Sequence, residues 1–127
     1  MEHSKSEDLK LYDAEYRFLE VVWELEPVSS TDLYKECLPR LGWKKSTTYT
    51  VLRKLCERGI LQNAQAKVTS LVKREDVQRK ESRAVVEKWF DHSLPKFLTA
   101  FFQDQKLSET EAEELKQLID AYRDKED

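Results

Sequence analysis

One stretch near the middle of the chain, residues 42–61, has the pattern of a single helix with two unlike faces. Its sequence is GWKKSTTYTVLRKLCERGIL. At about 100° per residue, one side of the helix collects the residues suited to a core, namely Thr48, Val51, Leu52 and Leu55. The rest of the chain must therefore supply a core against which this side can pack.

The opposite side of the predicted helix is polar, and its only acid is Glu57. Short hydroxyl side chains allow close approach to the edges of bases, and Arg and Lys reach phosphate or guanine. We therefore predict that this side contacts DNA in a major groove, through Lys44, Lys45, Ser46, Thr47, Tyr49, Thr50, Arg53 and Lys54. A solvated amphipathic helix is the alternative interpretation of the same pattern.

Residue types typical of helix boundaries stand at both ends of this helix. Ser46 or Thr47 is expected to cap the first turn by accepting a hydrogen bond from a free amide. Arg58 lies in the predicted last turn, and Gly59 supplies the left-handed residue that ends many helices. The sequence thus predicts both where the helix starts and where it stops.

The charge is unevenly distributed along the 127 residues, whose net charge is −3. Residues 1–42 carry a net charge of −5, residues 43–80 carry +7, and residues 81–127 carry −5. A basic segment between acidic ends is expected where one face of a protein meets phosphates. A winged-helix adaptor that binds only other proteins has no need of this segment, so the charge favours DNA binding, and the adaptor remains the alternative.

Two helices are expected before the polar-faced one. Residues 1–10 are polar and irregular, and we expect them to be disordered. A helical repeat of apolar residues begins at Asp13 and is closed by Pro27. Ser29 offers an N-cap for the second helix, and Pro39 is expected to end the regular part of that helix.

The pattern changes after the third helix. Ile60 to Gln65 and Lys67 to Lys73 lack helical spacing, which predicts a small hairpin with a tight connection near Asn63 to Lys67. A hairpin after a helix-turn-helix makes a winged helix. We therefore predict a mostly α protein, with a winged helix-turn-helix DNA-binding domain and short β-hairpin wing in residues 1–76, and a helical dimerisation domain in residues 77–127.

Three helical segments follow the hairpin. The first begins at Arg74 or Glu75, the second covers Leu94 to Phe102, and Ser108 caps the third. So few helices bury too little surface to be stable alone. Their apolar faces are predicted to form a homodimer, through Val86, Trp89, Phe90, Leu94, Phe97, Leu98, Phe101, Leu115, Leu118, Ile119 and Tyr122. Packing of these faces on the winged helix is the alternative.

Other classes of protein lack support in the sequence. No apolar run approaches the length of a membrane span and there is no leader sequence, so we expect a cytoplasmic protein without membrane insertion. Cys37 and Cys56 are isolated on apolar faces, as small buried residues often are. Without a metal-ligand cluster, a phosphate loop or a nucleophile motif, no enzyme, cofactor or metal site is expected.

The chain resembles the penicillinase repressor family of bacterial transcription factors, which includes β-lactamase, methicillin-resistance and copper-transport repressors. The resemblance rests on LYDAEYRFLEVVWELEPVSSTDLY, GWKKSTTYTVLRKLCERGIL, SLVKRED and KLSETEAEELKQLI. It implies a homodimeric winged-helix repressor of a resistance or stress gene that binds an inverted-repeat operator in double-stranded DNA. Thr47, Thr50 and the basic positions of the third helix would lie at the DNA.

The chain also departs from the family pattern. Ser46 stands where many relatives have lysine or threonine, so the operator is expected to differ from the usual one. The wing is shorter than in the β-lactamase type, and the Cys-x-Cys pairs of the copper-responsive members are absent. Relatives controlled by a membrane sensor protease are cut before a phenylalanine, which implies such a partner acting near Ala100 and Phe101. Ala100 replaces the asparagine of the best-matched members.

Overall fold

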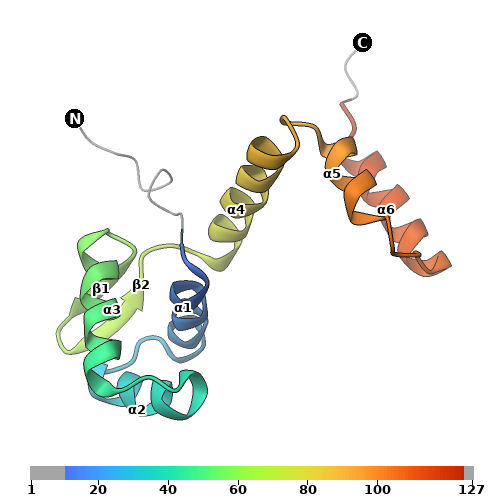
Figure 1. Ribbon diagram of the computed structural model, residues 1–127. Coiled ribbons are helices and arrows are strands. Elements are labelled where there is room, and N and C mark those ends of the chain that lie inside the picture. The colour runs from blue at the N-terminus through green and yellow to red at the C-terminus, as the bar shows by residue number, and fades with distance from the viewer. Residues whose placement is uncertain (1–10, 125–127) are drawn as a thin grey trace. The chain divides into compact units, whose positions relative to one another are not determined.

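The computed structural model describes residues 11–124 (Figure 1), and the chain divides into two compact units between Val85 and Val86. The expected disorder of residues 1–10 lies outside the described residues. The first unit contains α1 (Asp13–Leu25), α2 (Ser30–Leu41), α3 (Lys45–Glu57), β1 (Leu61–Ala64), β2 (Lys67–Ser70) and most of α4 (Arg74–Trp89). The second contains the end of α4, α5 (Leu94–Phe101) and α6 (Glu109–Tyr122).

This order of elements confirms the prediction of a mostly α chain with a winged helix-turn-helix followed by helices. The compact units meet inside α4, whereas the predicted functional boundary lies between residues 76 and 77. The position of the boundary between the DNA-binding and dimerising functions therefore stays a prediction.

α1 and α2 begin and pack largely as their sequences indicate. The Tyr12 amide, just before α1, donates to Glu15 Oε1 at 3.0 Å, and the Ser29 hydroxyl accepts from the Asp32 amide at 3.0 Å. The prediction that Pro39 ends the regular part of α2 is wrong, because α2 continues to Leu41. A proline this close to the end of a helix removes a single backbone bond, and the left-handed Gly42 (φ 71°) provides the actual stop.

The start of α3 differs from the prediction. Lys44 is the N-cap residue and no side chain caps the helix, so the capping roles expected of Ser46 and Thr47 are wrong. The Trp43 ring instead stacks on Phe18 of α1, with ring centres 5.4 Å apart and planes at 22°. Packing of this partly buried tryptophan anchors the chain just before α3, which explains how the helix can begin without a side-chain cap. At the other end Gly59 has the expected positive φ of 76°.

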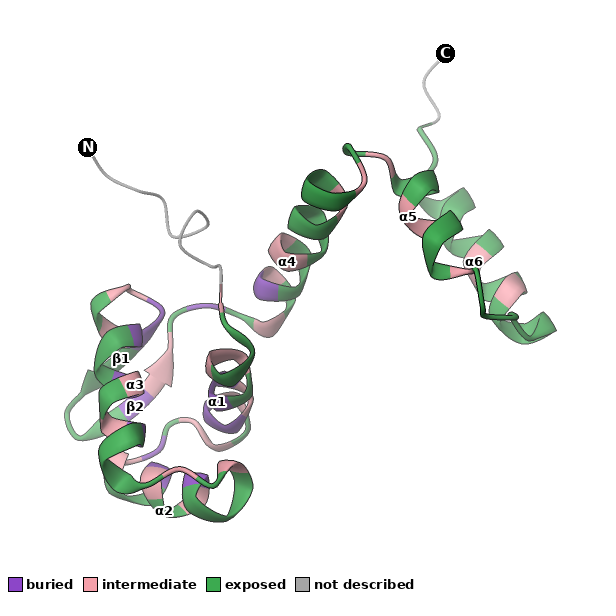
Figure 2. Cartoon of the chain, viewed as in Figure 1, coloured by how far each residue is buried: buried purple, intermediate pink, exposed green. Residues whose placement is uncertain are grey.

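The wing is a two-stranded antiparallel hairpin that joins the core. Leu61 pairs with Ser70 and Ala64 with Lys67, in a hairpin where the sequence predicted one. Val28, between α1 and α2, forms a bridge to Val68 with backbone bonds of 2.7 and 3.2 Å. Figure 2 shows the buried residues concentrated in this first unit. The hydrophobic ones are Phe18, Leu19, Val21, Val22, Val28, Leu33, Cys37, Leu52, Leu55, Ile60, Leu61, Val68, Val72 and Val77.

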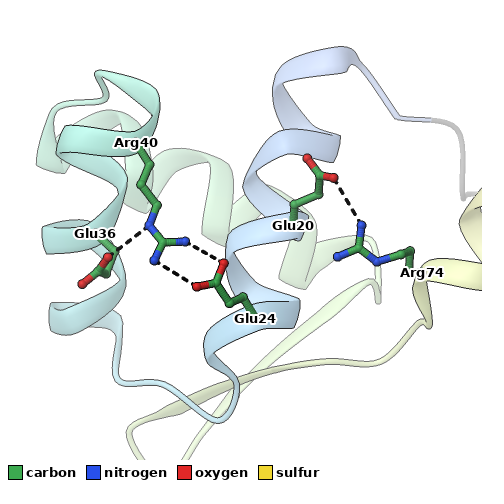
Figure 3. A network of polar contacts seen from close by, with 5 residues as sticks. All are labelled: Glu20, Glu24, Glu36, Arg40 and Arg74. Atoms are coloured by element: carbon green, nitrogen blue, oxygen red, sulfur yellow. Dashed lines mark hydrogen bonds and ion pairs between the residues drawn. The ribbon is translucent and has the colours of Figure 1, made fainter.

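Trp23 of α1 connects this core to the chain that leaves the wing. Its indole N–H donates to the Ser70 hydroxyl and to the Val72 carbonyl, both at 3.1 Å. The Arg74 guanidinium lies 4.9 Å from the indole ring centre and pairs with Glu20 at 3.2 Å (Figure 3). These contacts hold the first turn of α4 against α1.

Arg40 makes the corresponding link between α2 and α1 (Figure 3). Its guanidinium donates to both oxygens of Glu24, at 2.9 and 3.2 Å, and to Glu36 at 3.1 Å. The Glu24 carboxylate has a lowered pKa because it accepts hydrogen bonds from Arg40 and is attracted by its charge. The pair joins the outer faces of two helices whose inner faces pack in the core.

The second unit has no buried residue in α5 or α6, which Figure 2 shows in the colours of exposed and intermediate side chains. Both helices are well capped, since the Ser93 hydroxyl accepts from the Lys96 amide at 3.1 Å and the predicted cap Ser108 accepts from the Glu111 amide at 3.0 Å. Caps can define the ends of a helix but bury no apolar area. This unit therefore leaves most of its apolar surface exposed.

Candidate nucleic-acid interface

α3 presents a buried face and an exposed face, as its sequence predicts. Thr48, Leu52 and Leu55 are at most 3% exposed and lie in the core of the first unit. The exposed positions are Lys44, Lys45, Ser46, Thr47, Thr50, Arg53 and Lys54, and Tyr49 is half-buried. Most of the residues predicted to contact DNA therefore lie on the exposed side of α3, whereas Tyr49 also packs against the core and Lys44 precedes the helix.

Packing against α2 fixes the rotation of α3. Leu33 and Cys37 of α2 are fully buried in the same cluster as Leu52 and Leu55. Burial raises the pKa of the Cys37 thiol above its usual range, against a smaller lowering by the neighbouring Thr48 hydroxyl. The thiol is thus a neutral core group, which agrees with its prediction as a small buried residue.

The N-terminus of α3 concentrates positive charge. Lys44 and Lys45 stand at its first positions, and its first turn contains no acid. The first intrahelical bond runs from the Thr48 amide to the Lys44 carbonyl at 3.0 Å. The preceding amides have no partner within the helix, and the helix dipole places partial positive charge at the same end. This end of α3 is therefore suited to an anionic oxygen such as a DNA phosphate.

Sequence reasoning missed one residue beside this face. Tyr34 of α2 is half-buried, and its ring centre lies 5.9 Å from that of Tyr49. Lys45 Nζ lies 4.9 Å from the centre of the Tyr34 ring and 5.9 Å from that of Tyr49. The sequence offered one signal for Tyr34, namely that it directly follows the core residue Leu33 on the helix before the polar-faced one.

The wing offers little positive charge. Lys67 is the only charged residue among residues 61–70, and its side chain is exposed. The strands are joined by Gln65 and Ala66, which both have positive φ, 54° and 63°. The short hairpin thus carries one cation close to its tip.

The residues predicted to dimerise lie at the end of α4, on α5 and on α6. Phe97, Leu98, Phe101, Leu115 and Leu118 line one open groove of about 560 Å³, together with Phe102 and Leu107, and Glu111 and Glu114 also border it. The Phe90 ring meets that of Phe97 at 5.5 Å. The remaining predicted residues do not line the groove, and they are Val86, Trp89, Leu94, Ile119 and Tyr122.

Within residues 11–124, no group of three or more His, Cys, Asp or Glu side chains is placed to hold a metal ion. In the same part of the chain no helix is both long and apolar enough to cross a membrane.

Comparison with known proteins identifies relatives over nearly the whole chain. Residues 11–121 match the protein family described as penicillinase repressor. The chain is similar to the methicillin resistance regulatory protein MecI of Staphylococcus aureus, with 24% identity over 119 residues that cover 88% of this chain and 97% of that protein. It is also similar to the penicillinase repressor of Bacillus licheniformis, with 22% identity over 120 residues that cover 91% and 94%. The matched segment includes both compact units.

Proposed function

Because the chain belongs to the penicillinase repressor family, whose members are DNA-binding regulators and not enzymes, we propose that it represses transcription as a homodimer on an inverted-repeat operator. The observation that carries this proposal is the exposed polar and basic face of α3, directly opposite a buried face. The names of the relatives support a resistance or stress gene as the regulated target.

The residues of α3 take two roles in this proposal. Thr50 is exposed and lies two positions from buried Thr48, on the opposite side of the helix. Its short side chain can contact DNA only where the helix lies in a groove, so Thr50 is assigned to reading bases. Lys44 and Lys45, at the positive end of the helix, hold phosphate. Phosphate contacts position a protein on DNA, and base contacts provide its sequence preference.

The second unit supports the homodimer. Its helices have no buried residue, and its apolar groove is open to solvent. Leu118, which lines the groove, and neighbouring Ile119 are 53% and 58% exposed, and apolar surface gathered in this way marks a site of interaction. A second copy that covers these faces supplies the missing core, and a two-fold dimer presents two α3 helices to two half-sites of an operator.

A membrane sensor protease is a further proposed partner. Ala100 and Phe101 are both exposed, and they form the last residues of α5. A peptide bond in a helical turn must be unwound before a protease can cut it, and a terminal turn is the least costly place to unwind. Incubation with such a protease, followed by mass spectrometry, should give a fragment that begins at Phe101. Cleavage only at other positions would contradict the proposal that the protease acts at this site.

The main experiment selects preferred duplexes from a randomised library with the full-length protein, then measures mass in solution. We expect an inverted repeat bound by two chains. Leu118→Glu should sediment as a monomer and bind this duplex weakly, because it places a charge in the apolar groove. Gln117→Glu adds the same charge at the neighbouring exposed position and should behave as the parent.

Two outcomes would contradict the proposal. A full-length protein that remains monomeric at micromolar concentration would rule out the homodimer. A dimer that enriches no duplex at low salt would rule out DNA binding and leave a winged-helix protein adaptor as the explanation.

A further inference from the structure

Two tyrosines lie against the first residue of α3. Tyr34 of α2 and Tyr49 of α3 have ring centres 5.9 Å apart, with planes at 44°. Lys45 Nζ lies 4.9 Å and 5.9 Å from these two ring centres. Both distances fall within the range of about 6 Å in which an aromatic face attracts an ammonium group. The Lys45 side chain is therefore held by both helices.

These contacts leave the charge of Lys45 available. Within residues 11–124 Lys45 has no carboxylate partner, whereas Lys96 pairs with Asp91 and Lys116 with Glu113. A carboxylate would cancel the positive charge and would have to be displaced by a phosphate. An aromatic face attracts the ammonium through its quadrupole without carrying an opposite net charge. Lys45 is thus held in position while it remains able to attract an anion.

Confinement of this side chain has a consequence for binding. A lysine loses rotamer freedom when a ligand fixes it, and that loss opposes binding. A lysine that two rings already confine loses less rotamer freedom when it binds. Lys45 is also the first residue of α3, at the end of the helix where the backbone amides have no partner within the helix.

Tyr34 has little other structural role. Tyr49 packs against the hydrophobic core, but Tyr34 is not among the residues that do so. The Tyr34 ring makes a cation–π contact with Lys45 and a ring contact with Tyr49. Its removal should therefore leave the core intact, so a functional effect can be separated from unfolding.

We propose that Tyr34 is a positioning residue for DNA binding, whose ring holds Lys45 at the positive end of α3 where the DNA backbone would pass. The inference rests on the proposed function. It adds to that function a residue of α2 that acts through Lys45 and makes no DNA contact of its own.

The first test uses the free protein. Ring currents shift the resonances of protons that lie over an aromatic face, so the ε-methylene protons of Lys45 should resonate upfield of those of exposed Lys106. Tyr34→Leu should move the Lys45 signals toward the Lys106 position, and Tyr34→Phe should preserve their shift. Lys45 signals that Tyr34→Leu leaves unchanged would overturn the inference.

The second test measures affinity of full-length variants for the selected duplex. Tyr34→Leu should weaken binding about two- to fivefold, the size of one exposed cation–π contact. Tyr34→Phe should bind as the parent does, because the ring and not the hydroxyl is required. In a Lys45→Ala background Tyr34→Leu should have no further effect. Tyr12→Leu, at a tyrosine that is exposed and remote from Lys45 in the sequence, serves as the control.

The outcomes separate this inference from the function on which it rests. Independent, additive losses from Tyr34→Leu and Lys45→Ala would overturn the positioning role. Equal losses in Tyr34→Leu and Tyr34→Phe would overturn it as well, since the hydroxyl would then contact DNA directly. If the parent binds DNA and either result is found, only the inference falls. If the parent binds no DNA, the proposed function falls with it.

Discussion

Leu52 is the residue of α3 that tests the orientation of the helix most simply. Its side chain is 3% exposed and shares the buried cluster with Leu33 and Leu55. Truncation of a buried leucine to alanine removes apolar contacts and leaves a cavity, at a cost of roughly 2 to 5 kcal/mol. The total stability of a domain is only about 5 to 15 kcal/mol. Leu52→Ala should therefore remove a large share of the free energy of unfolding.

The assay is urea unfolding followed by circular dichroism, at one fixed protein concentration because dimerisation couples stability to concentration. Thr50→Ala is the matched control on the same helix. Thr50 is exposed, so its truncation should change the free energy of unfolding by no more than about 0.5 kcal/mol. The midpoint of Leu52→Ala should lie well below those of the parent and the control.

The result also bears on the DNA-binding face. If Leu52→Ala costs no more than Thr50→Ala, α3 is rotated from the orientation described, and the assignment of Thr50 to the exposed face is wrong as well. A large cost for Leu52→Ala with none for Thr50→Ala supports the arrangement in which one face is buried and the other is free to bind.

Three further predictions concern the wing, the link between α1 and α2, and the buried thiol. Ala66→Gly should raise the free energy of unfolding by about 0.5 to 1 kcal/mol, because left-handed backbone is costly for a residue with a side chain. Ala64→Gly, within β1, should lower it instead, and a loss from Ala66→Gly would contradict the turn geometry. Because Arg40 lowers the pKa of Glu24, their pair stabilises the fold above the ordinary glutamate pKa of about 4.3, and this contribution is lost as pH falls through the lower folded value. Glu24→Gln should make stability, followed by urea unfolding, less dependent on pH in this acidic range, and parallel curves for parent and variant would refute the linkage. Cys37 is fully buried and its pKa is raised by that burial, so mass spectrometry should find it unmodified by iodoacetamide at pH 8 until urea unfolds the chain. Rapid labelling of this thiol in the native protein would show that the core is open.

Local signals in the sequence predicted much of the fold. The caps at Ser29 and Ser108 and the left-handed stop at Gly59 are interactions between residues a few positions apart, so the sequence displays them directly. The apolar period of α1 begins at Asp13, as expected. The hairpin and its tight connection were also predicted, because a change of hydrophobic period is a local pattern.

Contacts between elements account for what the sequence did not show. The start of α3 depends on Trp43 stacking on Phe18, two residues that lie far apart in the chain. The position of Tyr34 beside Lys45 depends on how α2 packs on α3. The end of α2 at Leu41 shows that a proline near a helix end is a weaker signal than its usual reading implies. The start of α3 and the position of Tyr34 thus follow from packing and not from periodicity, whereas the end of α2 follows from the local backbone at Gly42.

The most direct test of the central claim, that α3 holds and reads DNA, compares Thr50→Ala with Lys44→Ala in salt titrations on the selected duplex and a random duplex. Lys44→Ala should weaken binding to both alike and reduce the slope of log K against log salt by roughly one, since each neutralised phosphate contributes about −0.9. Thr50→Ala should leave that slope unchanged and cost about 1 to 3 kcal/mol on the selected duplex only. Equal losses from Thr50→Ala on both duplexes, or no effect of either variant, would contradict the assignment of DNA recognition to this helix.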